Sequence, residues 1–214
     1  MVQSQIKKCE NCFLLDKKLK IKDTTVISLL KDKSVQHIQS KGCILSQGCL
    51  PMNIYCVAEG KINTIERDIE GREHLVSTFT PSNLFPLTNV ITDHPTNFEY
   101  VSEGKTRLCS FPVKTVRDLL SVDPQLSILF LKNACSKGLN SYERIVTLQS
   151  KSASDKVLRT VEQFMNEDGY CHLTRKEISL WANLTIETVI RTLTALEKKK
   201  QVKKSSKGIQ ILPQ

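Results

Sequence analysis

Several features that mark other protein classes are absent from this chain of 214 residues. No apolar run reaches the roughly 18 to 20 residues needed to cross a bilayer, and the first residues, MVQSQIKKCENC, lack the apolar core of a signal peptide. We therefore expect a cytoplasmic protein with no membrane segment. The sequence also shows no glycine-rich phosphate loop, no paired carboxylate site and no nucleophile–base arrangement, which predicts that the chain is not an enzyme.

Histidine is scarce and scattered, whereas cysteine is not. The four histidines supply no pair at the spacing of a structural zinc site. Eight cysteines in a chain without an export signal argue against a framework of disulfides. We expect most of them to be small buried apolar groups. Cys9 and Cys12 stand apart as a Cys-x-x-Cys pair, although no strand can precede them as in thiol–disulfide enzymes.

The formal net charge is +9, from 31 lysines and arginines against 22 aspartates and glutamates. A basic surface favours polyanionic partners, because its side chains displace the counterions condensed on nucleic acid. Charge alone does not identify such a partner, since many basic proteins bind no DNA.

Short alternating apolar stretches separated by glycines predict β-strands between residues 35 and 111. Glu59-Gly60 and Glu70-Gly71 are turn signals, because glycine accepts the positive φ of a tight hairpin. We expect an N-terminal segment over 1–30 and a β-roll sensor domain, a cupin-like jelly roll, over 31–113. Three prolines then indicate a loop or pocket wall: Pro81, Pro86 and Pro95.

A helical period follows the strands. Asp123-Pro124 is typical of a helix start, where the missing N–H of proline does no harm. Apolar or small residues then recur every three or four positions and form one stripe: Ile128, Leu131, Cys135, Gly138, Tyr142 and Ile145. The stripe can pack on the chain's own β-domain or on a parallel helix of a second subunit, with Gly138 permitting close approach. We favour the second reading, a dimerisation helix over 114–151.

The last segment, 152–214, contains two helix-start motifs in succession. Ser152 and Asp155 form a partial capping box for a helix that should end near Asp168-Gly169. Further on, Thr174 and Glu177 form a complete capping box at the start of a short helix.

A tight turn and a second helix come next. Asn183 suits the left-handed conformation of the turn, and Thr185 caps the second helix. The inward positions of that helix are Val189, Leu193 and Leu196. Two short helices joined in this way form a helix-turn-helix, whose second helix enters the major groove.

The outer face of the second helix carries Glu187 and Arg191, four residues apart. A carboxylate can accept from cytosine N4, and a guanidinium can donate twice to guanine. The alternative is an ordinary helix-stabilising ion pair. Beyond the helix, residues 203–212 read as a turn and edge strand, the wing of a winged helix, whose lysines would meet phosphate. For Lys198–Lys200 a solvated basic tail stays open.

With these motifs the chain resembles, over nearly its whole length, the CRP/FNR superfamily, named for the cyclic-AMP receptor protein and the fumarate–nitrate regulator. The stretch LTRKEISLWANLTIETVIRTL is close to the family's DNA-binding signature, and TIETVIR is nearer the FNR form, T-V-E-T-I-S-R. The resemblance implies an α+β chain with a β-roll, a long dimerisation helix and a C-terminal winged helix-turn-helix. It also implies a homodimer that binds double-stranded DNA and contacts RNA polymerase.

The resemblance further assigns the DNA contacts. It makes Glu187 and Arg191 the base readers and Arg175 a phosphate contact. Ile190 replaces the FNR-type serine, so only a TGA-like core of each palindromic half-site is implied. The remaining residues of the expected DNA-binding set are Thr185, Ile186, Thr188 and Lys207.

The effector is a separate question. In the cyclic-nucleotide branch a glutamate holds the ribose and an arginine pairs with the phosphate, whereas this chain has Leu87 and Asn97 at those positions. A buried phosphate charge without its cation is costly, which argues against cyclic AMP.

The cysteines suggest another signal. FNR proteins bind a [4Fe–4S] cluster through N-terminal cysteines and one late β-roll cysteine, and here Cys9, Cys12 and Cys109 match three of these positions. Near Lys18 the remaining cysteine is missing. A cluster would need a fourth ligand from an outside thiol or from Asp16, Cys43 or Cys49.

The pattern therefore favours a second branch of the family, in which an N-terminal cysteine and the late cysteine form a reversible disulfide. A vestigial motif, zinc or a small ligand in the β-roll stays open. Two readings from other classes also stay open: a cyclic-nucleotide-like sensor or scaffold module whose C-terminal helices bind protein, and a thiol–disulfide redox protein.

Overall fold

The computed structural model describes residues 21–67, 69–71, 73–150 and 152–212. The chain divides into two compact units, Met1–Lys137 and Gly138–Gln214. The boundary falls inside helix α5 (Pro124–Gln149). No helix in the described part of the chain is long and apolar enough to span a membrane. The cysteine pair Cys9 and Cys12 lies outside the described residues.

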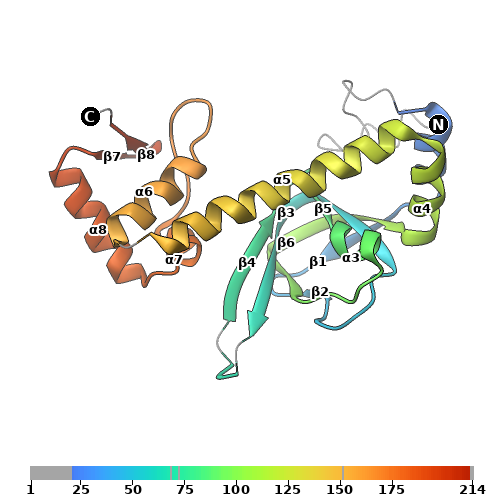
Figure 1. The fold of residues 1–214 in the computed structure, drawn as a ribbon, viewed down its shortest axis with the longest axis horizontal. Helices are drawn as coiled ribbons and strands as arrows, with labels where there is room; N and C mark the ends of the chain where they lie inside the picture. The colour runs from blue at the N-terminus through green and yellow to red at the C-terminus, as the bar shows by residue number, and fades with distance from the viewer. Residues whose placement is uncertain (1–20, 68, 72, 151, 213–214) are drawn as a thin grey trace. The chain divides into compact units, whose positions relative to one another are not determined.

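The first unit is the predicted β-roll, and the α+β fold class is confirmed (Figure 1). Its strands run antiparallel in the order β1-β6-β3-β4, with β2 paired to β6 and β5 paired to β3. The strands are β1 (Ser34–Ile38), β2 (Cys43–Leu45), β3 (Asn53–Arg67), β4 (Glu73–Phe79), β5 (Leu84–Phe85) and β6 (Glu99–Pro112). Within the described residues, the helices that precede α5 are α2 (Asp23–Lys31), α3 (Leu87–Thr92) and α4 (Val113–Val122).

The predicted turn at Glu59-Gly60 is wrong. Strand β3 continues through Gly60 and pairs with β6 on both sides of it, with register shifts around Glu59. A β-carbon on Gly60 would lie 2.6 Å from Thr106 Oγ1 and 2.7 Å from the Lys105 carbonyl oxygen. Glycine with φ +86° therefore forms a β-bulge pressed against β6 rather than a hairpin. At Gly71, φ +76°, the predicted turn is confirmed between β3 and β4.

Side chains along β3 point alternately to the two faces of the sheet and pack into two separate cores. Tyr55 and Val57 point into a cluster with the rings of Phe79, Phe85 and Tyr100. On the other face, a second cluster packs under α2, α3, α4 and the start of α5; we call it the helix-side core. Its buried members are Leu29, Leu30, Ile54, Cys56, Leu84, Leu87, Val90, Cys109, Phe111, Val116, Leu126, Leu129 and Phe130.

Asp123 separates α4 from α5, so the segment predicted as the dimerisation helix contains two helices. The predicted start at Pro124 is confirmed. The Asp123 carboxylate accepts the backbone N–H groups of Gln125 at 3.0 Å and Lys22 at 3.0 Å. Burial opposes ionisation of this carboxyl, but hydrogen bonds from Thr25 and these amides lower its pKa.

The second unit is a winged helix-turn-helix with its own core. Its elements are α6 (Ala153–Gln163), α7 (Arg175–Ala182), α8 (Ile186–Lys198), β7 (Val202–Ser205) and β8 (Gly208–Ile211). The three helices and the β7–β8 hairpin enclose fully buried side chains: Val157, Val161, Cys171, Ile178, Val189, Leu193, Leu196, Val202 and Ile209. This confirms the architecture predicted for the C-terminal part.

The predicted end of α6 near Asp168-Gly169 is wrong, because the helix ends at Gln163. Met165 then forms an antiparallel bridge with Cys171. Gly169, with φ +78°, lies in the turn between these two residues and donates its N–H to the Asn166 carbonyl at 2.9 Å. The glycine marks a turn beyond the helix rather than the helix end itself.

Candidate nucleic-acid interface

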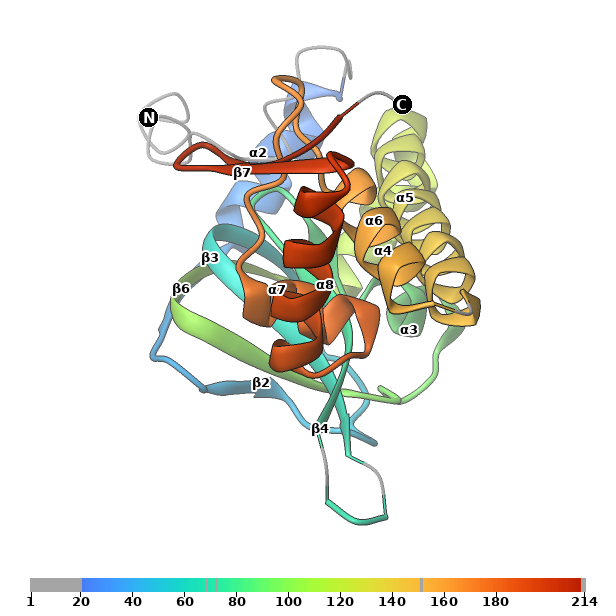
Figure 2. The same cartoon turned by 90° about the vertical axis from the view of Figure 1, so that its left-hand side faces the viewer.

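Helices α7 and α8 pack against each other (Figure 2), and local capping fixes where each begins and ends. The Thr174 hydroxyl accepts the Glu177 N–H at 3.2 Å, and the Thr174 N–H donates to the Glu177 carboxylate at 2.7 Å. Asn183 adopts φ 51° and ψ 55°, the left-handed conformation, at the turn. The Thr185 hydroxyl accepts the Thr188 N–H at 3.2 Å at the start of α8. All three predicted signals are confirmed.

Burial of one face of α8 leaves the other face open. Val189, Leu193 and Leu196 are 0%, 1% and 2% exposed. Ile186 and Ile190 on the outer face are 40% and 51% exposed. Because they lie four residues apart on the helix, these two side chains form a small exposed apolar area on a charged face, available for contact with a partner.

Glu187 and Arg191 are exposed beside these two isoleucines. Within the residues that the structure describes, no ion pair or hydrogen bond joins the two side chains, although four residues separate them. The alternative reading, a helix-stabilising ion pair, is therefore not what the structure contains. The face presents one carboxylate and one guanidinium, each with unused hydrogen-bonding capacity.

The other predicted contact residues surround this face. Arg175 is the exposed first residue of α7. The hydroxyls of Thr185 and Thr188 lie 2.9 Å apart at the N-terminus of α8, where unpaired backbone N–H groups favour anions. Lys207 is exposed in the turn between β7 and β8, and its backbone N–H donates to Ser205 Oγ at 3.2 Å.

One lysine of the wing has a structural role that the sequence did not reveal. Lys204 Nζ lies 2.7 Å from the Glu197 carboxylate, and the Lys204 N–H donates to the same group at 3.2 Å. The hydrogen bonds from Lys204 lower the pKa of Glu197. This contact ties the wing to α8, while Lys203 and Lys207 point to solvent.

A second contact missed from the sequence holds α7. The guanidinium carbon of Arg144, near the end of α5, lies 4.9 Å from the centroid of the Trp181 ring. Arg144 also donates to the Leu180 carbonyl at 3.3 Å. Desolvation by burial lowers the pKa of Arg144. The last turns of α5 are thus fastened to α7 within the second unit by a cation–π contact.

The stripe predicted on α5 is largely exposed. Leu131, Tyr142 and Ile145 are 62%, 70% and 51% exposed, and Leu139 beside them is 64% exposed. A β-carbon built on Gly138 would meet no atom within 4 Å. Among the residues that the structure describes, none therefore covers most of the stripe.

The cysteines predicted to sense redox state are only partly described. Cys109 lies on β6 and is 4% exposed in the helix-side core. Cys9, Cys12 and Asp16 lie outside the described residues, so their distance from Cys109 is not tested. Among the residues that are described, no group of three or more histidine, cysteine, aspartate or glutamate side chains could hold a metal ion. Cys43 and Cys49 are exposed, and burial of the Sγ atom raises the pKa of Cys43.

The positions that bind a cyclic nucleotide in the family do not fit one here. Leu87, at the expected ribose position, is 5% exposed and belongs to the helix-side core. Asn97, at the expected phosphate position, is exposed and carries no charge. Neither residue offers the carboxylate or the guanidinium that the ligand requires.

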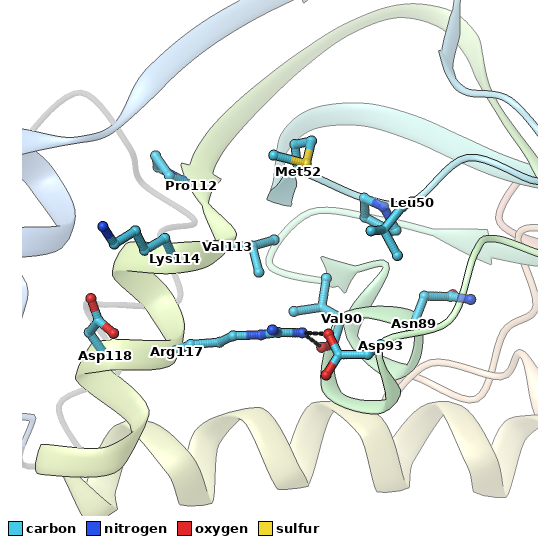
Figure 3. A pocket seen from close by; sticks show the side chains of 11 residues that line it. Leu50, Met52, Asn89, Val90, Asp93, Pro112, Val113, Lys114, Arg117 and Asp118 are labelled. Atoms are coloured by element: carbon cyan, nitrogen blue, oxygen red, sulfur yellow. Dashed lines mark hydrogen bonds and ion pairs between the residues drawn. The ribbon is translucent and has the colours of Figure 1, made fainter.

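A hollow of about 390 Å³ lies elsewhere in the first unit, between α3 and the start of α4 (Figure 3). An ion pair between Arg117 and Asp93 crosses it, and Arg117 also donates to the Val90 carbonyl at 2.5 Å. The loop before β3 contributes Leu50 and Met52. The proline-rich region was predicted to form a loop or pocket wall, and α3 and the loop after it form one wall of this hollow.

Comparisons with known proteins agree with this architecture. A family model described as the cyclic nucleotide-binding domain matches residues 35–123. The transcriptional activator protein Anr of Pseudomonas protegens is 23% identical over 171 residues, which are 75% of this chain and 69% of that protein. The nitrogen fixation regulation protein FixK of Bradyrhizobium diazoefficiens is 25% identical over 185 residues, 82% of this chain and 77% of that protein. The solved structure of FixK2 from Bradyrhizobium japonicum has a TM-score of 0.67 at 16% identity, covering 85% and 93% of the two chains.

Proposed function

We propose that the chain is a DNA-binding transcription regulator of the CRP/FNR family rather than an enzyme, and that it binds as a homodimer to a palindrome with TGA-like half-sites. The observation that carries the proposal is the outer face of α8, where exposed Glu187 and Arg191 flank exposed Ile186 and Ile190. A helix with buried apolar residues on one face and exposed hydrogen-bonding groups on the other is suited to the major groove.

Each exposed side chain has a proposed role. Arg191 donates to the O6 and N7 of guanine, and Glu187 accepts from cytosine N4. Arg175 and Lys207 contact phosphates, so they contribute affinity without choosing a sequence. The rest of the α8 N-terminus, Thr185, Ile186 and Thr188, completes the DNA-contacting set.

The exposed stripe on α5 supports the proposal that the protein is a dimer. Tyr142 is 70% exposed and Leu131 is 62% exposed, and burying such surface against an identical helix stabilises association. The open space at Gly138 allows two α5 helices to approach closely. A two-fold dimer places two α8 helices on half-sites about 34–36 Å apart, one turn of DNA.

We assign the controlling signal to thiol redox state or to a metal or iron–sulfur centre rather than to cyclic AMP. Leu87 and Asn97 do not supply the groups that hold a cyclic nucleotide. The resemblance to the family points to Cys109 with Cys9 or Cys12 as the redox-active set. Contact with RNA polymerase and a cytoplasmic location complete the proposal and follow from the resemblance to the family.

The test compares sequence-specific with non-specific DNA binding. Duplexes selected from a random pool by the wild-type protein should contain two-fold related TGA-like half-sites. Arg191→Ala should weaken binding to the selected duplex by about 30-fold or more, since each of two copies contributes about 1–3 kcal/mol of discrimination. Binding to a scrambled duplex should change little.

Arg159→Ala is the matched control, because it removes an exposed guanidinium from α6 in the same unit. It should leave the ratio of specific to scrambled affinity unchanged. If Arg191→Ala also leaves that ratio unchanged, or if selection enriches no sequence, base reading by α8 is refuted.

A further inference from the structure

Two cysteines face each other across the central pair of strands in the β-roll. In the antiparallel register of β3 and β6, Cys56 is the direct partner of Cys109. The same register continues on both sides, with Tyr55 opposite Ser110 and Val57 opposite Leu108. Directly opposed residues place their side chains on the same face of a sheet, so both sulfur atoms belong to the helix-side core. Cys56 is 3% exposed and Cys109 is 4% exposed.

The backbone hydrogen bonds define the geometry of this pair. The Val57 N–H donates to the Asn83 carbonyl at 3.1 Å, and the Val57 carbonyl accepts the Ser82 N–H at 3.0 Å. Val57 therefore points its backbone groups away from β6, and alternation points those of Cys56 towards it. Met52 lies four residues before Cys56, so its backbone groups should point to the same side. Its carbonyl accepts the N–H of Val113, the residue directly after β6, at 3.0 Å.

Cys56 and Cys109 thus form a hydrogen-bonded cross-strand pair, in which α-carbons lie about 5.5 Å apart. Disulfides most often join α-carbons about 5.5–6 Å apart. Their β-carbons are usually about 3.5–4.5 Å apart, whereas opposed β-carbons in a sheet are about 4.5–5.5 Å apart. A small inward movement of the two strands is enough to close a sulfur–sulfur bond.

We propose that Cys56 and Cys109 form an intramolecular disulfide when the protein meets a small two-electron oxidant such as hydrogen peroxide. One thiolate attacks a peroxide oxygen, the O–O bond breaks, and the sulfur becomes a sulfenic acid as the first water leaves. The second sulfur attacks this sulfenic sulfur, the S–S bond forms and the second water leaves. The two thiols lose two electrons and two protons, and the peroxide is reduced to two water molecules.

This assignment gives Cys109 a partner different from the one that the family resemblance implies. The bond needs no residue of the N-terminal segment and no DNA, so it stands or falls independently of the proposed operator binding. It would join β3 to β6 within the helix-side core, to which Leu29 of α2, Val116 of α4 and Leu126 of α5 also belong. Because both sulfurs are buried, the oxidant reaches them only when these helices open locally.

Peptide mapping of the full chain tests the proposal. We use a chain with Cys43→Ala and Cys49→Ala, both at exposed positions, so that the tryptic peptide 42–61 contains Cys56 as its single cysteine. After treatment with hydrogen peroxide and alkylation of remaining thiols in denaturant, peptide 42–61 should be joined to peptide 108–114. Dithiothreitol should separate the two.

Two results would overturn the proposal. One is a disulfide link between peptide 108–114 and peptide 9–17, the peptide that contains Cys9 and Cys12. The other is a Cys109 thiol that still reacts completely with the alkylating reagent after peroxide has oxidised the exposed Cys135. Both readouts come from a chain that keeps Cys56 and Cys109. No buried residue is substituted, so a failure of a core variant to fold cannot affect either result.

Single variants sharpen the result. Cys56→Ala should leave Cys109 reduced under the same treatment. Cys171→Ala is the matched control, because Cys171 is 0% exposed in the core of the second unit. It should leave the disulfide link between peptides 42–61 and 108–114 intact, whereas loss of the free Cys109 thiol in Cys56→Ala would contradict the assignment.

Discussion

Lys137 offers a quantitative test of how α5 is attached to the β-roll. Its ammonium group lies 4.3 Å from the centroid of the Phe79 ring and donates to the Thr78 carbonyl at 2.6 Å. Desolvation by burial lowers the pKa of Lys137 from 10.5 to about 8. Replacing it with methionine keeps most of the side-chain volume and removes the charge.

The sign of the effect follows from proton linkage. Between pH 8 and 10.5 the unfolded chain keeps a proton on Lys137 that the folded chain loses, so the free energy of unfolding rises with pH in this window. Below pH 8 the folded chain keeps the proton too, and the buried charge costs its full amount. The gap between the two pKa values corresponds to roughly 3 kcal/mol.

The ring contact offsets part of this cost, by about 0.5–2 kcal/mol. We therefore expect Lys137→Met to raise the free energy of unfolding by about 1–2 kcal/mol at pH 7, and this gain should shrink to nothing near pH 10.5. Urea denaturation followed by circular dichroism at several pH values measures both quantities.

Lys132→Met is the matched control, since Lys132 is an exposed lysine on the same helix. It should change stability by less than about 0.5 kcal/mol and without the same pH dependence. If Lys137→Met follows the wild-type pH dependence between pH 7 and 10, the charge of Lys137 is not buried at a cost, and the reasoning fails.

Three further changes test the dimer, the turn and the wing. Leu131→Glu should shift sedimentation from dimer to monomer, because it places a charge on the stripe of α5, whereas the neighbouring Lys132→Glu should not; a stable Leu131→Glu dimer would contradict the interface. Asn183→Ala should lower the stability of the second unit, monitored by Trp181 fluorescence, by about 1–2 kcal/mol, since alanine is strained at φ 51°; Asn183→Gly should be close to neutral, and equal losses would refute the conformational argument. Lys207→Gln should reduce the slope of log K against log salt by about 1.8, from two lost phosphate contacts per dimer; an unchanged slope would remove Lys207 from the interface.

The parts of the fold that the sequence predicts well depend on short-range interactions. The capping box of Thr174 and Glu177, the left-handed Asn183 and the cap at Thr185 each involve residues no more than three apart. Such motifs satisfy backbone N–H groups whatever the rest of the chain does. This is why the helix-turn-helix could be located from sequence and its exposed face anticipated.

The two errors have a common physical origin. Gly60 and Gly169 both have positive φ, as their sequence context suggested. Positive φ serves a hairpin, a β-bulge or a turn after a helix equally well, and only pairing with distant residues decides among them. At Gly60 that pairing is with β6, more than forty residues along the chain.

Contacts between residues far apart in the sequence could not be predicted for a similar reason. Glu197 pairs with Lys204 across the base of the wing, and Arg144 stacks on Trp181. Each of these charged residues fits an ordinary solvated helix or tail when the sequence is considered alone. Their roles appear only when the second unit is folded, because partner choice depends on tertiary packing.

The bulge at Gly60 also bears on the proposed disulfide. Register shifts occur between Val57 and Glu59 and again between Glu59 and Lys61, so the register of β3 with β6 before the bulge differs from the register after it. Cys56 lies before the bulge, in the stretch where Ile54 faces Phe111 and buried side chains hold the register. A slip of one residue there would turn Cys56 and its buried neighbours on β3 to the opposite face of the sheet, away from the core in which each now packs. The same packing that stabilises this end of the β-roll therefore keeps the two sulfur atoms opposed.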